Sequence, residues 1–158
     1  MRVLGIDPGL RVAGYGCITY DRSNPRPILV EAGAIKLDVT KSVSHRLHQL
    51  WTDITEIIRD VSPDIVAVET VFSHARQVAT AITMGHARGV ILLAVENARL
   101  PLVELAPTEI KKSVTGNGRS TKDQIQQAIT HLLQLKEVPE PPDVADALAI
   151  AITGAMRG

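Results

Sequence analysis

The stretch Val3-Leu4-Gly5-Ile6-Asp7-Pro8-Gly9 decides the fold, because it puts an acidic residue at the end of a buried strand. Its aliphatic residues are apolar enough for a strand that is buried on both faces. The Pro8-Gly9 pair ends that strand, since proline has no N–H group and glycine opens positive φ. Asp7 therefore lies at the carboxyl end of a predicted central strand, where ligands and catalytic groups gather in open α/β sheets. An aspartate that only caps the turn explains this stretch equally well.

The composition indicates one globular domain over residues 1–158, large enough to bury a proper core. With 17 basic and 17 acidic residues the net charge is zero, so any surface that binds nucleic acid must be local. The lone Cys17 excludes an internal disulfide and fits a reducing compartment. No signal peptide is recognised, and the apolar run 89–95 is far shorter than the ~18 residues of a membrane helix. We expect a cytoplasmic protein with no membrane partner.

The first half of the chain predicts three strands and then a crossover. Residues 12–20 and 28–37 follow the first strand as an antiparallel meander, with a bulge predicted at Gly33. Gly14 and Gly16 suggest a close backbone approach across the hairpin. Apolar residues then recur at helical spacing over 42–61, and a short, fully buried strand ends at Glu69. A helix followed by a buried strand implies a crossover, so this strand runs parallel to the first. Glu69 is then expected at the same edge of the sheet as Asp7.

The second half predicts one more strand and several helices. The helix over 75–97 is apolar nearly all round between residues 87 and 95. Such a helix is buried on more than one face, either against a partner subunit or inside one protomer. Thr121 and Gln124 form a capping box for a helix that we expect to reach Leu135. The remaining elements are a strand over 102–105, a short helix over 107–112, a loop over 116–119 and a last helix over 143–155.

Asp143 and Asp146 lie three residues apart and so share a face of the last helix. They could simply complement the helix dipole. An apolar run directly after Asp146 indicates instead that the helix packs on the sheet near this end. Four carboxylates would then converge, and like charges raise one another's pKa unless cations neutralise them. Oxygen ligands select Mg²⁺ or Mn²⁺, and two such ions ~3.5–4 Å apart can support phosphodiester cleavage.

These motifs together resemble the RuvC family, bacterial Holliday-junction resolvases with an RNase H-like fold. The resemblance covers nearly the whole chain. The first segment, residues 5–9 with Gly14-Tyr15-Gly16, looks like the family's opening motif, and residues 69–72 look like its second. Residues 87–89 fall in the family's dimer-forming helix. The stretch from Lys111 to Lys122, which includes Lys112 and Arg119, resembles a basic DNA-contacting segment, and residues 143–151 resemble the last acidic motif.

The resemblance implies a five-stranded mixed sheet flanked by helices and a homodimeric enzyme that resolves four-way DNA junctions by paired symmetric nicks, in recombination and repair. It implies two Mg²⁺ ions in each active site, with Mn²⁺ as a substitute, and RuvA and RuvB as partners. The implied metal ligands and catalytic residues are Asp7, Glu69, Asp143 and Asp146. DNA contacts are implied at Lys111 and Lys122, and base stacking at Phe72. One departure is Gly154, where many members have a histidine, and a longer family tail would lie beyond Gly158.

Two other function classes remain open from the residues. A junction-binding protein without catalysis is one, although such a protein gains nothing from four carboxylates facing phosphates. An actin-like or sugar-kinase ATPase is the other, but that fold needs a second domain with its own phosphate loop. A measurement of nucleotide binding distinguishes such an ATPase from a nuclease, which does not require a nucleotide. Without the resemblance, Phe72, the chain's only phenylalanine, would ordinarily be a core residue. His45 and His48 share a helical face without a third ligand nearby, so we do not expect a metal there.

Overall fold

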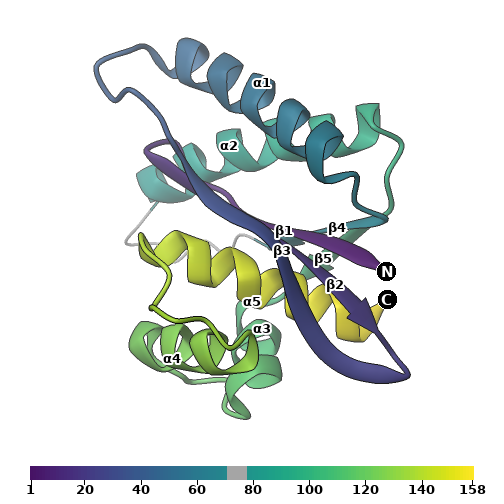
Figure 1. The fold of residues 1–158 in the computed structure, drawn as a ribbon. Helices are drawn as coiled ribbons and strands as arrows, with labels where there is room; N and C mark the ends of the chain where they lie inside the picture. Colours follow the sequence, from purple (N-terminus) through teal and green to yellow (C-terminus); the bar gives the residue numbers. More distant parts are fainter. Residues whose placement is uncertain (71–77) are drawn as a thin grey trace.

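The computed structural model describes residues 1–70 and 78–158, and shows five strands and five helices among them (Figure 1). The strands form one sheet in the order β3-β2-β1-β4-β5. Along the chain the elements are β1 (Arg2–Asp7), β2 (Val12–Asp21), β3 (Asn24–Lys36), α1 (Val43–Val61), β4 (Ile65–Glu69), α2 (Val78–Asn97), β5 (Leu102–Leu105), α3 (Pro107–Thr115), α4 (Lys122–Leu132) and α5 (Pro142–Arg157).

The sheet is mixed, as the sequence predicts. β1, β2 and β3 form an antiparallel meander, and β4 and β5 run parallel to β1. The pairing of β1 with β4 runs from Val3 opposite Ile65 to Ile6 opposite Val68. It ends there, one residue short of Asp7 and Glu69. The two acidic residues thus lie at the same edge of the sheet, where the strands separate.

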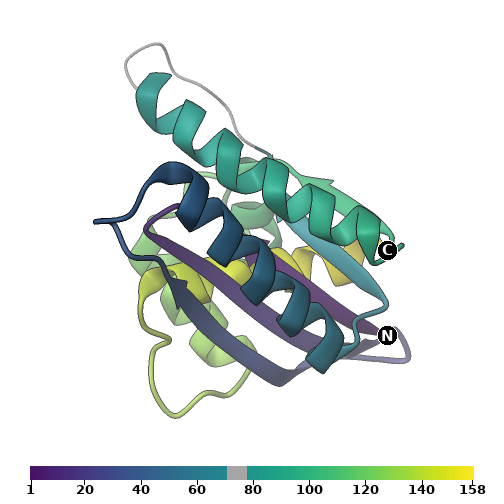
Figure 2. The ribbon, with the colours of Figure 1, turned by 90° about the horizontal axis from the view of Figure 1, so that it is seen from above.

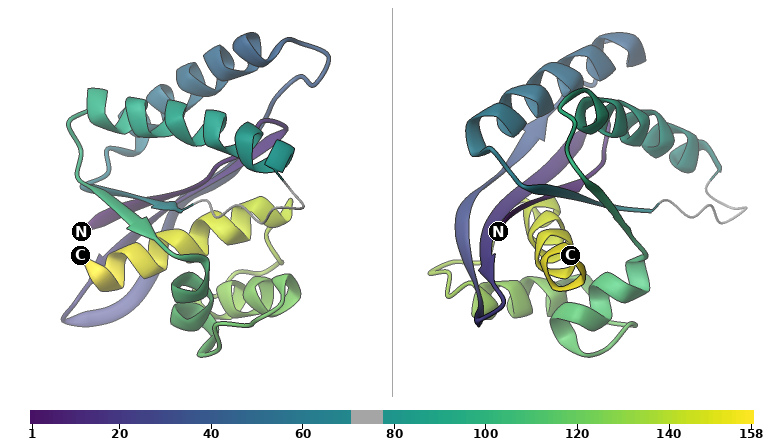
Figure 3. Two further views of the ribbon diagram at one scale, coloured as in Figure 1. Left: turned by 180° about the vertical axis from the view of Figure 1, so that it is seen from behind. Right: turned by 90° about the vertical axis from the view of Figure 1, so that its right-hand side faces the viewer.

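Helices cover both faces of the sheet. α1 and α2 lie side by side on one face, and α5 crosses the other face with α3 and α4 beyond it (Figures 1, 2 and 3). The period of two along β1 divides the core between these layers. Leu4 and Ile6 pack with α1 and α2, whereas Val3 packs with the helices of the opposite face. β1 is therefore buried on both sides, which explains its continuous apolar run.

Helix α5 lies directly on the sheet because glycines face it. A Cβ at Gly5 would overlap the backbone of Ala147 and Ala151, and one at Gly14 would overlap the carbonyl oxygen of Asp143. The sequence suggests that Gly14 allows a close approach across the hairpin; the structure shows that it admits α5. Nearly all of α5 from Val144 to Ala155 is buried. This close packing brings the first turn of α5 to the edge that holds Asp7.

Some predicted boundaries differ from the structure. α3 runs on to Thr115 instead of ending at Lys112, and α4 ends at Leu132 instead of Leu135. The bulge expected at Gly33 is wrong: Gly33 pairs regularly with Tyr15, and the register between β2 and β3 shifts instead after the pair of Cys17 and Glu31, nearer the hairpin turn. The predicted first turn of α2, residues 75–77, lies outside the described residues. Cys17 is buried, as expected for a small apolar residue.

Helix α2 is apolar over a longer stretch than the run 89–95 that stands out in the sequence. An 18-residue window within Val78–Asn97 has a mean hydropathy of 1.6, so by length and composition alone this helix could cross a membrane. This is weak support for a membrane segment, because the core helix of a globular protein meets the same criteria. Here one side of α2 packs into the core through Ala87, Ile91, Ala94 and Val95. The opposite side exposes Ile82 and Leu93.

Candidate active site

Three elements bring four carboxylates to one edge of the sheet. Asp7 ends β1 and Glu69 ends β4, and the parallel pairing of these strands puts both ends together. Asp143 and Asp146 lie in the first turns of α5. The start of α5 can lie this close to the sheet because Gly14, which pairs with Asp7, has no Cβ to overlap the main chain of Asp143. The local glycines thus determine how closely α5 brings its two aspartates to the strand ends.

The four carboxylates line a cleft of about 840 Å³. One wall consists of the turn after β1, which includes Leu10 and Arg11, and the first turns of α2. The other wall is made by α3, α4 and the start of α5, and it contributes Lys111 and Lys122. Acidic groups in a cleft with basic groups on its wall are suited to a substrate that has phosphates and needs a cation.

Burial and mutual repulsion raise the pKa of three of these carboxyl groups. The pKa of Asp7 lies well above its ordinary value because the group is desolvated and because Asp146, Glu69 and Asp143 face it. Burial also raises the pKa of Glu69, with Asp146 as the next cause. The pKa of Asp146 is likewise raised, first by burial. The cleft thus disfavours negative charge unless a positive charge joins it.

Two lysines supply part of that positive charge. The Nζ of Lys122 lies 3.9 Å from a carboxylate oxygen of Asp146. Lys111 and Lys122 both lower the pKa of Glu69 and of Asp146. Lys122 is the first residue of α4, and the predicted capping box before it is confirmed: the hydroxyl of Thr121 accepts from the N–H of Gln124, whose side chain accepts from the N–H of Thr121. This cap fixes where α4 begins.

The loop between α3 and α4 is held by hydrogen bonds among its own residues. Thr115 accepts from the N–H of Asn117 at 3.1 Å, and Ser120 donates to the carbonyl of Asn117 at 2.6 Å. The N–H of Arg119 donates to the Asn117 side chain at 3.0 Å. Arg119 and Lys112 are exposed and do not line the cleft. The structure therefore places Lys111 and Lys122 in the cleft and the other two cations outside it.

Other residues of the cleft were missed by the sequence analysis. Arg11 follows the turn after Asp7, and Thr80, Thr83 and Met84 face the cleft from α2. The position of Arg11, four residues after Asp7 in the turn that ends β1, is the signal that could have found it. The α2 residues give no such signal, because only the packing of α2 on the sheet brings them to the cleft. Phe72 lies outside the described residues.

The donors in the cleft are chemically suited to a hard divalent cation. All four acidic residues offer oxygen, which Mg²⁺ and Mn²⁺ prefer. Among residues 1–70 and 78–158, no group of three His, Cys, Asp or Glu side chains has the geometry of a metal site as it stands. A divalent cation in the cleft would offset the mutual repulsion of these carboxylates. A cation in the cleft would favour the charged forms of Asp7, Glu69 and Asp146, whose pKa values burial raises.

Comparisons with known proteins match this chain to one family over nearly its whole length. Residues 3–154 match the family described as crossover junction endodeoxyribonuclease RuvC. RuvC of Rhodopirellula baltica is 47% identical over 152 residues, which are 96% of this chain and 84% of that protein. RuvC of Brevibacillus brevis is 45% identical over 98% of this chain and 92% of its own length. Thermus thermophilus RuvC in complex with a Holliday junction substrate has a similar structure, with a TM-score of 0.87 and 30% identity over 98% of this chain and 93% of that one.

Proposed function

This chain belongs to the RuvC family of crossover junction endodeoxyribonucleases and resolves Holliday junctions, and we propose that it cuts them by paired symmetric nicks at the cleft described above. The observation that supports this site is the meeting of Asp7, Glu69, Asp143 and Asp146 in a cleft with Lys111 and Lys122. These are the positions at which the family resemblance implies catalytic carboxylates and DNA contacts. Resolution of junctions belongs to homologous recombination and DNA repair.

Magnesium is the proposed cofactor, two ions to each site. Asp7 and Glu69 would hold them from the strand ends, and Asp143 and Asp146 from α5. When bound, such a pair activates a water molecule and stabilises the leaving oxygen of a phosphodiester. Mn²⁺ offers the same preference for oxygen ligands and should substitute. Asp146 also faces Lys122, so it could act by orienting the other ligands instead of binding directly.

The chain's own residues then have distinct tasks. The carboxylates must stay deprotonated, and Lys111 and Lys122 favour that state because they lower the pKa of Glu69 and of Asp146. The same ammonium groups can bind the phosphates on either side of the scissile bond. We propose weaker phosphate contacts for Lys112 and Arg119, which lie outside the cleft. For Phe72, base stacking at the open centre of the junction remains our proposal.

A homodimer is the proposed assembly, formed through the outer side of α2. Ile82 and Leu93 are 57% and 54% exposed there. Gly85 and Gly89 lie between them at helical spacing, and a Cβ on either glycine would meet nothing within 4 Å in one protomer. Glycines on such a side allow two helices to approach closely. A two-fold dimer presents two identical sites, which suits a substrate with two equivalent strands to cut.

The remaining expectations follow from family membership. We propose that the chain works in the cytoplasm as a single domain and meets a RuvA–RuvB branch-migration complex on the junction. A binding protein without catalysis is disfavoured, because four repelling carboxylates weaken phosphate binding unless cations join them. An actin-like ATPase is disfavoured by the match of residues 3–154 to the nuclease family. A nucleotide-binding measurement should accordingly show no binding of ATP.

A synthetic four-way junction with each strand end-labelled in turn tests the proposal. With Mg²⁺ we expect nicks in two opposite strands at symmetry-related positions, and no cutting of a linear duplex of the same sequence. Nicks that fall equally on the duplex, or in a single strand only, would contradict a junction-resolving dimer. Binding without any nick in Mg²⁺ or Mn²⁺ would favour the non-catalytic alternative.

A further inference from the structure

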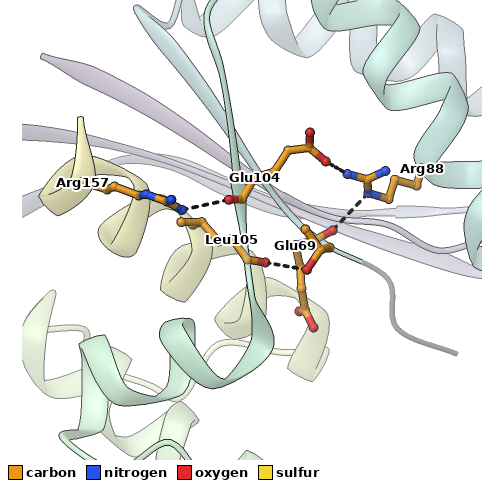
Figure 4. Close-up of polar contacts among 6 residues, drawn as sticks. Glu69, Arg88, Glu104, Leu105 and Arg157 are labelled. Atoms are coloured by element: carbon orange, nitrogen blue, oxygen red, sulfur yellow. Dashed lines mark hydrogen bonds and ion pairs between the residues drawn. The ribbon is translucent and has the colours of Figure 1, made fainter. Parts of the chain in front are cut away.

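Arg88 lies in the apolar helix α2 and connects it to two strand ends. Its side chain is only 18% exposed. The Nε–H donates to the main-chain carbonyl of Glu69 at 3.2 Å, and an Nη atom pairs with the carboxylate of Glu104 on β5 (Figure 4). A largely buried guanidinium is costly unless it is paired, and here both edges of the group have an acceptor.

The main chain at Glu69 needs such support, because the sheet holds it from one side. The ladder with β1 ends at Val68, whereas on the other side Glu69 pairs with Leu105 of β5. The next residue, Thr70, adds a hydrogen bond from its N–H to the carbonyl of Leu105 at 2.8 Å. Arg88 thus supplies the contact that joins the end of β4 to a third element, α2.

The orientation of the side chains shows how Arg88 acts on Glu69. In Figure 4 the carboxylate of Glu69 points away from the guanidinium, toward the helices on the other face of the sheet. Arg88 therefore contacts the backbone of Glu69 and leaves its carboxylate free to face the cleft. A carbonyl fixed at this point restricts the direction in which the Cα–Cβ bond of the last strand residue projects.

We propose that Arg88 is a positioning residue, which Glu104 holds in place and which sets the direction of the Glu69 carboxylate and so the metal affinity of the cleft. This inference rests on the proposed function of Glu69 as a metal ligand. Residues that orient a ligand in this way typically change metal affinity or activity by ~10–100-fold when they are removed. A purely structural tie between α2 and the sheet would change stability instead.

The test compares Arg88→Ala and Arg88→Lys with Arg157→Ala. Arg157 is a suitable control because it also contacts the Glu104 region, donating to the Glu104 main-chain carbonyl at 3.0 Å, but is 55% exposed and does not touch Glu69. Three quantities are measured for each protein: Mn²⁺ binding to the free protein by electron paramagnetic resonance, the Mn²⁺ concentration for half-maximal junction cleavage, and the melting temperature. Glu104→Ala removes the carboxylate that pairs with Arg88 and leaves Arg88 itself unaltered. This variant replaces Arg88→Ala in the test if Arg88→Ala fails to fold.

We expect Arg88→Ala and Glu104→Ala to weaken Mn²⁺ binding about tenfold and to raise the half-maximal concentration to match. Arg88→Lys should fold normally and bind Mn²⁺ with an affinity between those of Arg88→Ala and the unaltered protein, because an ammonium group cannot donate in two fixed directions. Arg157→Ala should keep the affinity of the unaltered protein. If the folded Arg88 and Glu104 variants bind Mn²⁺ as tightly as the unaltered protein, the inference about Arg88 is wrong, and the proposed metal site is not affected. If Glu69→Gln also binds Mn²⁺ like the unaltered protein, the proposed metal site itself is wrong, and the inference fails with it.

Discussion

Asp7 faces three other carboxylates, and its protonation couples the stability of the fold to pH. Its pKa in the folded protein is raised above the ordinary value of 3.8, first by burial and then by Asp146, Glu69 and Asp143. A carboxyl group with a raised pKa binds its proton more tightly in the folded state than in the unfolded state. It therefore favours folding fully below its unfolded pKa, and that contribution is lost as the pH rises through the folded pKa.

Replacing this charge should stabilise the metal-free protein. In EDTA at pH 7 we expect Asp7→Asn to raise the free energy of unfolding by about 0.5–2 kcal/mol, as is common when a functional site stores repulsion. The gain should shrink as the pH falls, because protonation of Asp7 then removes the same charge from the unaltered protein. Urea denaturation at several pH values measures it. Asp60→Asn, which removes a carboxylate on the exposed surface, is the control and should not raise the free energy of unfolding at pH 7.

The two cleft lysines should affect DNA through their charge. We expect Lys111→Ala and Lys122→Ala each to slow cleavage. Each should also reduce the magnitude of the slope of log binding constant against log salt concentration by about 1, because one phosphate contact is lost. Filter binding to a junction at several salt concentrations, with Ca²⁺ in place of Mg²⁺, gives that slope. Lys41→Ala, on an exposed turn remote in sequence from both lysines, provides the reference. Slopes that match the reference in both cleft variants would rule out phosphate contacts.

At the scale of the element, the close approach of α5 to the sheet decides whether the site assembles. A Cβ at Gly14 would overlap the main chain of Asp143, which cannot move without shifting the first turn of α5. We expect Gly14→Ala to cost about 1–3 kcal/mol, the usual cost of overpacking, and to lower cleavage further than the loss of folded protein explains. Thermal unfolding and cleavage measured on one preparation separate the two effects.

Gly33→Ala is the matched control, since it also adds a methyl group to a strand glycine of the same sheet. There the Cβ would meet the hydroxyl of Tyr15 at 2.8 Å, which is the movable end of a side chain. Tyr15 can turn away at the cost of its hydrogen bond to Glu31. This variant should keep its cleavage rate. Equal cleavage by the Gly14 and Gly33 variants would show that the position of α5 is not what assembles the site.

The elements that sequence reasoning found are those with a local physical signal. The Pro8-Gly9 stop, the cap at Thr121 and the parallel placement of β4 all follow from nearby residues, and the structure confirms them. The role of Arg88 could not be predicted, because its two acceptors come from different strands. The polar residue in an apolar helix was a signal that some acceptor exists, without showing which. Likewise the sequence suggested close approach at Gly14 but not that α5 was the partner.

At the scale of the whole molecule, the outer side of α2 distinguishes a dimer from a monomer. We expect Leu93→Asp, which buries a charge in the proposed interface, to give a folded monomer by light scattering at micromolar concentration. Val39→Asp, at a position that is 52% exposed in the turn before α1, should remain dimeric. A dimer that survives Leu93→Asp would place the interface elsewhere, and a monomer in the unaltered protein would contradict the proposed assembly.

The central claim is that one cleft of carboxylates performs the cleavage while other residues supply affinity for DNA. The most direct test is the Asp7→Asn protein in single-turnover cleavage of an end-labelled four-way junction, with Mg²⁺ and with the protein in excess. We predict that this variant binds the junction as tightly as the unaltered protein and leaves both pairs of strands uncut. Paired nicks at the rate of the unaltered protein would show that Asp7 is not part of the catalytic site and that the chemistry lies elsewhere in the chain.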